Sequence, residues 1–271
     1  MLIAQLTDLH IKQGGKQAYR RVDTLACLQK AVVHINQLSP RPDYLVITGD
    51  LGDFGTPDEY QLIKQELLKV ELPMLVVPGN HDHRDNLREG LKGLVEFDHP
   101  EFCNFVVDQD DTVLIGLDSS VIGKPYGHLS PETLAWLEST LEQHHDKPAM
   151  MFLHHPPMQV GLNHMDVQNL QNADELHAVL AKFNNILGIC AGHLHRSITA
   201  MWNSIPVWVG PSHSHSVTLD LDPNAPSSFS LEPTAIQLLT IEQQSVVSHL
   251  SFINDSEGPY PFFDEQGNLI D

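Results

Sequence analysis

Short, largely apolar runs alternate with helix-like stretches through the first two thirds of the chain, and this alternation restricts the fold more than any other feature. Runs of four to six such residues suit buried strands and are too short for helices. Apolar residues at helical spacing fill the stretches between them, as in Val22–Leu38, and Thr56-Pro57-Asp58-Glu59 is typical of a helix start. This order predicts the α/β class. The predicted strands are Leu2–Leu6, Tyr44–Thr48, Met74–Val77, Val113–Leu117, Ala149–Leu153 and Ile186–Ala191, with later helices at Pro131–Gln143 and Ala173–Phe183.

From Ser197 onward the pattern changes to strands without intervening helices. The predicted strands there are Ile198–Trp202, Pro206–Val209, Ala235–Ile241 and Val246–Ile253. Antiparallel strands after an α/β half favour one large mixed sheet or two packed sheets. We expect a single domain over residues 1–271, in which the segment from about 216 to 271 completes the second sheet and serves as a cap or dimerisation element.

Asp, Asn and His residues follow the predicted strands at the points where these end. Five segments share this feature, namely LTDLH, ITGDLGD, VVPGNHD, FLHHPP and ICAGHLH. In α/β proteins, ligand sites gather at the C-terminal ends of strands. Each segment alone could be an ordinary polar turn, but five together predict a site.

The residue types in these segments predict metal ligands. Asp8 with His10, and His193 with His195, are pairs two residues apart, a spacing that lets both side chains of an extended segment reach one ion. Seven candidates are too many for one tetrahedral ion and suit two ions that share a carboxylate. Oxygen and imidazole ligands without thiolate favour Fe²⁺, Zn²⁺, Mn²⁺ or Co²⁺.

The charge of the chain argues against several partners. There are 35 acidic and 15 basic residues, a formal charge of −20, and only Lys182 and Arg196 are basic after Met150. Such a surface does not favour a nucleic-acid polymer or an anionic membrane. The chain has no apolar run of about 18 residues. Its three cysteines are scattered, which favours reduced thiols in the cytoplasm.

The five segments, in this order and spacing, resemble the signature of the calcineurin-like metallophosphoesterases, from residue 1 to about 215. Within that superfamily the chain is similar to the class III cyclic nucleotide phosphodiesterases and to the bacterial glycerophosphodiesterase branch, through Gly55–Tyr60, His215 and GPYPFFDE at 258–265. The resemblance implies a four-layer αββα sandwich of two mixed sheets flanked by helices. It also implies a binuclear metal site at the C-terminal ends of the strands.

The resemblance implies a role for each matching residue. Asp8, His10 and His195 would hold the first ion, Asp50 would bridge, and Asn80, His154 and His193 would hold the second. His81 would be the catalytic group, and His81, His215 and Asn80 would contact the substrate. Asp82 is expected to cap a helix starting at His83 or to orient a ligand histidine, and His83 to face solvent. The roles of His213 and His164 stay open.

These features together predict metal-dependent hydrolysis of small phosphodiesters, such as glycerophosphodiesters or related alkyl and aryl diesters. The alternatives are a cyclic AMP phosphodiesterase, a phosphomonoesterase, a nucleotide pyrophosphatase and a non-catalytic scaffold. Tyr260, Phe262 and Phe263 are too apolar for a free tail, so we also expect a homo-oligomer, a dimer or larger.

Overall fold

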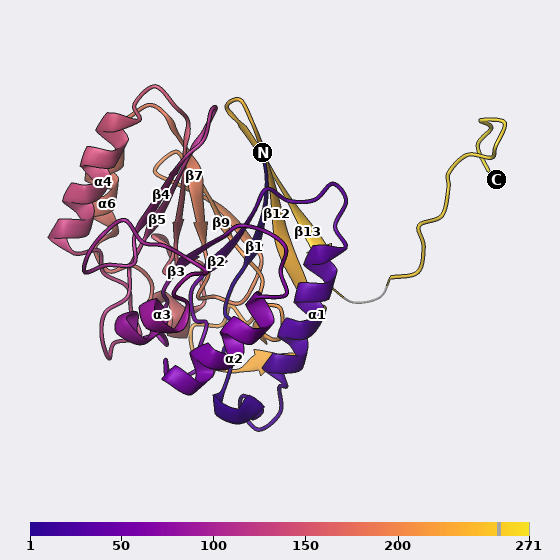
Figure 1. The fold of residues 1–271 in the computed structure, drawn as a ribbon, viewed down its shortest axis with the longest axis horizontal. Helices are drawn as coiled ribbons and strands as arrows, with labels where there is room; N and C mark the ends of the chain where they lie inside the picture. Colours follow the sequence, from indigo (N-terminus) through magenta and orange to yellow (C-terminus); the bar gives the residue numbers. More distant parts are fainter. Residues whose placement is uncertain (254–255, 271) are drawn as a thin grey trace.

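Two β-sheets form the centre of the computed structural model, which describes residues 1–253 and 256–270 (Figure 1). The first sheet has the order β13-β12-β1-β2-β3 and the second the order β4-β5-β6-β7-β9-β8. The strands of the first sheet are β1 (Leu2–Leu6), β2 (Tyr44–Thr48), β3 (Met74–Val77), β12 (Ala235–Glu242) and β13 (Ser245–Phe252). Those of the second are β4 (Phe105–Asp108), β5 (Val113–Leu117), β6 (Ala149–Leu153), β7 (Ile186–Ala191), β8 (Ile198–Trp202) and β9 (Ile205–Val209).

Helices cover the outer face of each sheet. On the first sheet lie α1 (Thr24–Asn36), α2 (Pro57–Leu67) and α3 (Arg84–Gly90), and on the second α4 (Pro131–Gln143) and α6 (Ala173–Leu180). The short elements are η1 (Gln13–Gly15), α5 (Asn163–Asp166), β10 (Ser216–Val217) and β11 (Phe229–Ser230). The predicted four-layer αββα sandwich is confirmed.

The side chains of the central strands alternate between two apolar layers. In β1, Ala4 and Leu6 pack under the helices, whereas Ile3 points into the layer between the sheets. Met151 of β6 packs toward α4 and α6, whereas Phe152 points between the sheets. A strand buried on both faces reads as a continuous apolar run, which explains why these strands could be located from the sequence.

The C-terminal strands correct one expectation. The described residues of the segment 216–271 do not complete the second sheet, because β12 pairs antiparallel with β1 and extends the first sheet, and β13 forms its edge. An alternating apolar pattern identifies a strand with one exposed face. It does not specify which of two sheets the strand joins, because that depends on long-range pairing.

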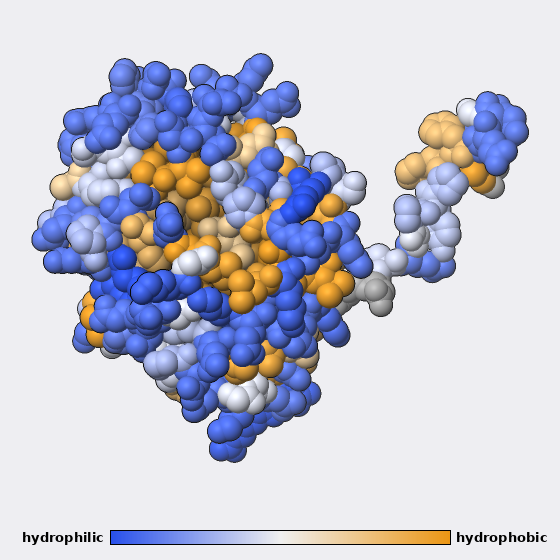
Figure 2. All heavy atoms as spheres, viewed as in Figure 1, coloured by the Kyte–Doolittle hydropathy of each residue, from blue (hydrophilic) through white to orange (hydrophobic). Residues whose placement is uncertain are grey.

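The segment 256–270 extends away from the two sheets (Figure 1). Tyr260 is 67 % exposed and Phe262 78 % exposed, and Phe263, Leu269 and Ile270 are also exposed. Figure 2 shows apolar side chains gathered at the far end of this segment. Among the described residues, no helix has the length and apolar character needed to cross a bilayer.

An ion pair joins the two halves of the fold near their polar edge. Arg84 begins α3 on the first sheet, and Asp118 directly follows β5 of the second. The Arg84 guanidinium donates to both Asp118 oxygens, at 2.5 and 3.2 Å, and to the carbonyl of Ser120. The Asp118 carboxylate is buried and also accepts from the backbone N–H of Cys103 and Ser120.

The Arg84→Met variant is expected to be less stable by about 3 kcal/mol or more, because it leaves the buried Asp118 carboxylate without its counter-ion. Urea unfolding of both proteins measures this difference. The control is Arg41→Met, which removes an exposed pair with Glu71 at 3.9 Å and should change stability by less than about 0.5 kcal/mol. Equal losses in the two variants would contradict a structural role for the Arg84 pair.

Candidate metal centre

The predicted ligands lie at five neighbouring strand ends. Asp8 and His10 follow β1, Asp50 follows β2, Asn80 follows β3, His154 follows β6, and His193 and His195 follow β7. Backbone hydrogen bonds connect these ends, from Asp8 N–H to the Gly49 carbonyl at 3.0 Å and from Gly192 N–H to the His154 carbonyl at 2.9 Å. The first bond joins the ends of β1 and β2 in the first sheet, and the second joins the ends of β6 and β7 in the second sheet.

The backbone of this region is unusual. Five of the seven predicted ligands have a positive φ, between 46° and 72°: Asp8, His10, Asp50, His193 and His195. Non-glycine residues in this left-handed region are uncommon, and when they cluster they mark functional sites, where surrounding structure holds them in place. The ligand positions are therefore not part of extended strands, and the alternation of side chains between the two faces of a strand ends before them.

Two glycines allow the strand ends to approach one another closely. A Cβ on Gly79 would lie 2.1 Å from Oδ1 of Asp50, and a Cβ on Gly49 would lie 2.4 Å from Nδ1 of His154. Neither contact is sterically possible. Each glycine thus precedes a predicted ligand because a side chain there would push the centre apart.

Asp8, His10 and His195 form one compact group. Nε2 of His10 lies 3.2 Å from Nε2 of His195, which in turn lies 3.4 Å from Oδ1 of Asp8. All three side chains are buried. Two imidazole nitrogens and a carboxylate oxygen at these separations match the ligand atoms of one divalent ion.

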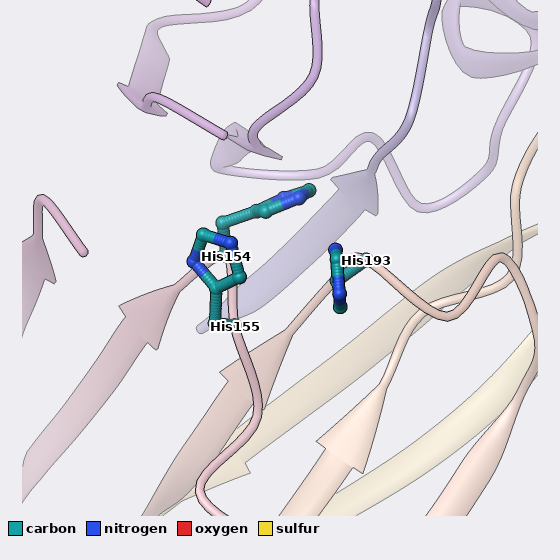
Figure 3. Close-up of side chains that lie close together, drawn as sticks. All are labelled: His154, His155 and His193. Atoms are coloured by element: carbon teal, nitrogen blue, oxygen red, sulfur yellow. The ribbon is translucent and has the colours of Figure 1, made fainter. Parts of the chain in front are cut away.

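Asp50 lies between this group and a second one. Its Oδ2 is 3.6 Å from Nε2 of His10 and 3.4 Å from Nε2 of His154. His154, His155 and His193 form a buried group with one nitrogen of each within 4.8 Å of the others (Figure 3). The buried Oδ1 of Asn80 and Nε2 of His154 have no hydrogen-bond partner within the described part of the chain.

The electrostatics of the centre favour a bound cation. Burial raises the pKa of Asp8 to about 6, although His154 opposes this shift. Burial lowers the pKa of His154, but Asp50 outweighs it and raises the pKa to about 9. Burial also keeps the pKa of His193 and His195 well below the usual range, so both present neutral imidazoles. Unpaired buried nitrogens and oxygens beside two carboxylates therefore fit divalent ions.

Neighbouring groups fix the orientation of two predicted ligands. Nδ1 of His10 lies 3.2 Å from Asp53, whose other oxygen accepts from Lys12 at 2.5 Å. Nδ1 of His154 donates to the Thr48 carbonyl at 2.7 Å, which directs its Nε2 toward Asp50. Such contacts set the tautomer of a ligand histidine. Asp53, Lys12 and Thr48 were not predicted from the sequence.

His81 and His215 both lie close to His10. The ring centroid of His81 is 4.7 Å from that of His10 and the centroid of His215 is 5.9 Å away. His81 donates its backbone N–H to Asp50, and its Nδ1 lies 2.8 Å from the carbonyl of Asp53. His215 is buried, 4.5 Å from the ring of His195, with Nδ1 2.9 Å from the hydroxyl of Ser214.

Asp82 has a different place from the one expected as a helix cap. Helix α3 starts at Arg84, with the exposed His83 as its N-cap residue, and the Asp82 carboxylate accepts from the backbone N–H groups of Leu51, Gly52 and Gly79 and from the Tyr60 hydroxyl. It thus holds the loops after β2 and β3 together. The cap expectation failed because the sequence shows only that Asp82 stands just before a helix. It does not show that the Asp82 carboxylate accepts hydrogen bonds from loops that are distant in sequence.

The two histidines with open roles lie outside these groups. His213 is buried, with Nε2 3.4 Å from the carbonyl of Thr24. His164 lies in α5, next to Met165, which packs against the end of β7.

A cavity of about 840 Å³ opens beside Asn80 and His81. Its remaining wall includes Lys12, Tyr19, Arg20, Asp53, Phe54 and Ile122. Phe54 is 70 % exposed and Ile122 77 % exposed. No periodic pattern or motif predicted these wall residues, because they lie in irregular loops.

Comparison with known proteins agrees with this geometry. Residues 1–197 match the calcineurin-like phosphoesterase family. The chain is 43 % identical to a probable glycerophosphodiester phosphodiesterase of Arcobacter nitrofigilis, over the whole of both chains. It is 32 % identical to the 3',5'-cyclic adenosine monophosphate phosphodiesterase of Escherichia coli K12, covering 89 % of this chain and 88 % of that one.

A solved structure shows the same fold at lower identity. The dimetal phosphatase of Danio rerio superposes with a TM-score of 0.68 at 15 % identity, covering 94 % of this chain and 97 % of the other. The extent of the family match and the identity to these relatives lead to one conclusion. This chain belongs to the calcineurin-like phosphoesterase family.

Proposed function

We propose that the protein is a phosphodiesterase that hydrolyses small phosphodiesters with the help of two divalent metal ions. The observation that carries this proposal is the position of Asp50, one carboxylate within 3.6 Å of nitrogens from two separate ligand groups. A carboxylate shared in this way suits two adjacent ions. Relatives named as glycerophosphodiester and cyclic nucleotide phosphodiesterases support the reaction class.

The proposed ligands divide as the resemblance implies. Asp8, His10 and His195 would hold the first ion, Asn80, His154 and His193 the second, and Asp50 both. Two such ions, when bound, supply a water that is easily deprotonated and offset the negative charge of the phosphoryl group. The mixed oxygen and imidazole set accepts Fe²⁺, Zn²⁺, Mn²⁺ or Co²⁺.

His81 is the proposed proton-handling group. Its Nδ1 faces the Asp53 carbonyl, which only accepts, so Nδ1 carries a proton and Nε2 is left for the substrate. The side chain also lines the cavity. A cationic His81 could therefore donate a proton from Nε2 to the departing alkoxide.

Asn80 and His215 are the other proposed contacts of the substrate phosphate. Asn80 lies beside His81 in the cavity wall, and its amide N–H₂ could donate to a phosphoryl oxygen while Oδ1 faces an ion. His215 packs against His195 and Tyr19, with ring centroids 4.5 and 5.2 Å apart. That position supports a second donor to the phosphate, beside the first ion.

The charge of the protein favours a substrate with few phosphates. The chain carries a formal charge of −20, so a polyanion would be repelled along most of the surface. A pair of divalent ions would outweigh the two ligand carboxylates and make the centre locally positive. A single diester meets that local field alone, which favours small substrates over nucleic acids.

A cyclic nucleotide is the second candidate substrate. The 32 % identity to a cyclic AMP phosphodiesterase favours it, and the aromatic side chains of Tyr19 and Phe54 in the cavity wall could stack on a base. The glycerophosphodiester assignment has the support of higher identity over the full chain. A non-catalytic scaffold is disfavoured because every expected ligand position is occupied by a suitable residue.

Two further proposals concern assembly and location. The exposed aromatic residues of 256–270 support a homo-oligomer in which another copy covers them. The free cysteines Cys27, Cys103 and Cys190 support a reducing, cytoplasmic location.

A comparison of rates on four substrates tests the proposed reaction. The metal-loaded protein should hydrolyse bis(p-nitrophenyl) phosphate and glycerophosphoethanolamine faster than p-nitrophenyl phosphate, because the centre suits a diester. The rate of cyclic AMP hydrolysis in the same assay tests the second candidate substrate. Removal of metal by a chelator should abolish turnover, and added Mn²⁺ or Zn²⁺ should restore it.

Two results of this assay would count against the proposal. Turnover of the monoester alone would make the protein a phosphomonoesterase. A metal-replete sample that hydrolyses none of the four substrates would revive the scaffold alternative.

His81→Ala should leave two ions per chain but lower kcat on glycerophosphoethanolamine by about 100-fold or more, because a poor leaving group needs a proton. The matched control is His145→Ala, an exposed histidine after α4 that is not part of the cavity wall, which should keep its kcat. Metal analysis and steady-state kinetics measure both quantities. Normal turnover of the alkyl diester by His81→Ala would rule out the role.

A further inference from the structure

His155 is a buried imidazole in the centre for which the proposed function has no role. It follows His154 at the end of β6 and is fully buried. Figure 3 shows its ring beside those of His154 and His193, and the ring centroid of His155 lies 4.8 Å from each of them. A polar ring in this position has to satisfy its nitrogens.

One edge of the His155 ring is fixed by the loop after β5. Its Nδ1 lies 2.9 Å from the hydroxyl of Ser119. Gly127 lies against the same edge, where a Cβ would be 2.6 Å from Nδ1. With Nδ1 held in this way, Nε2 is the nitrogen available to the other imidazoles.

Nε2 of His155 and Nε2 of His193 are both buried, and neither has a hydrogen-bond partner among residues 1–253 and 256–270. Leaving two such nitrogens unpaired is unfavourable. The rings are close enough to pair. His10 and His195, with centroids 4.9 Å apart, already bring their Nε2 atoms to 3.2 Å.

We propose that His155 is a positioning residue that orients His193. Nε2–H of His193 donates to Nε2 of His155, and Nδ1–H of His155 donates to the Ser119 hydroxyl. This inference rests on the proposed function, in which His193 binds an ion through its unprotonated nitrogen and its other N–H needs an acceptor.

Two of the other ligand histidines, His10 and His154, support this reading. Nδ1 of His10 faces Asp53 and Nδ1 of His154 faces the Thr48 carbonyl, each within 3.2 Å. The proposed second ion has two histidine ligands, His154 and His193. Among the described residues, a hydrogen-bond partner for the ring is present for His154 and is missing for Nε2 of His193. His155 supplies the missing one, and Ser119 connects it to the loop after β5.

Metal titration of His155→Phe tests the proposal, because Phe keeps the ring volume and removes both nitrogens. Apo protein titrated calorimetrically with Mn²⁺ should bind one ion with the wild-type affinity and the second about 10- to 100-fold more weakly. His155→Gln should recover most of that loss, because its amide oxygen can accept where Nε2 did. The control His34→Phe changes a half-buried histidine that contacts Ser251, and it should bind both ions normally.

The outcomes separate this inference from the proposed function. Wild-type protein that fails to bind two ions would overturn the proposed function itself. Wild-type protein that binds two, with His155→Phe binding both equally well, would overturn only the role of His155. A Gln variant as weak as Phe would also overturn it, since His155 would then be a ligand rather than an acceptor.

A second variant keeps the test valid if His155→Phe does not fold, which thermal unfolding would reveal. Ser119→Ala leaves the ring in place and removes only the group that fixes Nδ1. It should weaken the second ion and leave the first unchanged. Unchanged affinity for both ions in this variant would count against the proposal.

Discussion

The buried carboxylates of Asp8 and Asp50 set the condition that the rest of the centre has to meet. One oxygen of each carboxylate and one ring nitrogen of His154 lie within 4.8 Å of one another, and burial drives the carboxyl of Asp8 toward its neutral form. The protein's own side chains thus leave a carboxyl whose charged form is disfavoured and several unpaired lone pairs together in a buried space. A compact positive charge resolves both at once, which is what divalent ions provide.

The fold holds this arrangement against considerable local strain. Left-handed backbone at five ligand positions costs on the order of 1–3 kcal/mol each. The two sheets share an apolar layer, and the loops after their strands are tied together by Asp82 on one side and by the Arg84–Asp118 pair across the sheets. Because each loop is held by residues from other loops, the ligands keep their positions without relying on their own conformational preference.

Much of this architecture could be predicted from the chain alone, and the failures have physical causes. Strands such as Leu2–Leu6 and Tyr44–Thr48 were located to the residue because burial on both faces leaves a simple apolar pattern. The sheet joined by Ala235–Glu242 was predicted wrongly, since pairing with β1 depends on a contact far away in sequence. Local pattern does not encode such contacts.

The site shows the same division between local and distant signals. The ligand positions could be named because each stands in a short motif, although their roles remain proposals. Asp82 was expected to cap a helix or to orient a ligand histidine, and its carboxylate instead accepts hydrogen bonds from the backbone of two loops. His155 was overlooked because the strand ends at Leu153, and beyond that point side-chain direction follows from φ and ψ values that sequence does not reveal.

The cavity wall has a consequence for how such a protein can diverge. Tyr19, Phe54 and Ile122 are 51, 70 and 77 % exposed, and Arg20 is exposed as well, so this wall belongs to the surface and not to the buried ligand groups. Substitutions in this wall should change the free energy of unfolding only slightly, because exposed positions tolerate change. After gene duplication, one copy could acquire a new substrate through this wall while inheriting its reaction chemistry intact. Two relatives of this chain are named for different substrate classes, glycerophosphodiesters and cyclic nucleotides, and divergence of the cavity wall alone would account for such a difference.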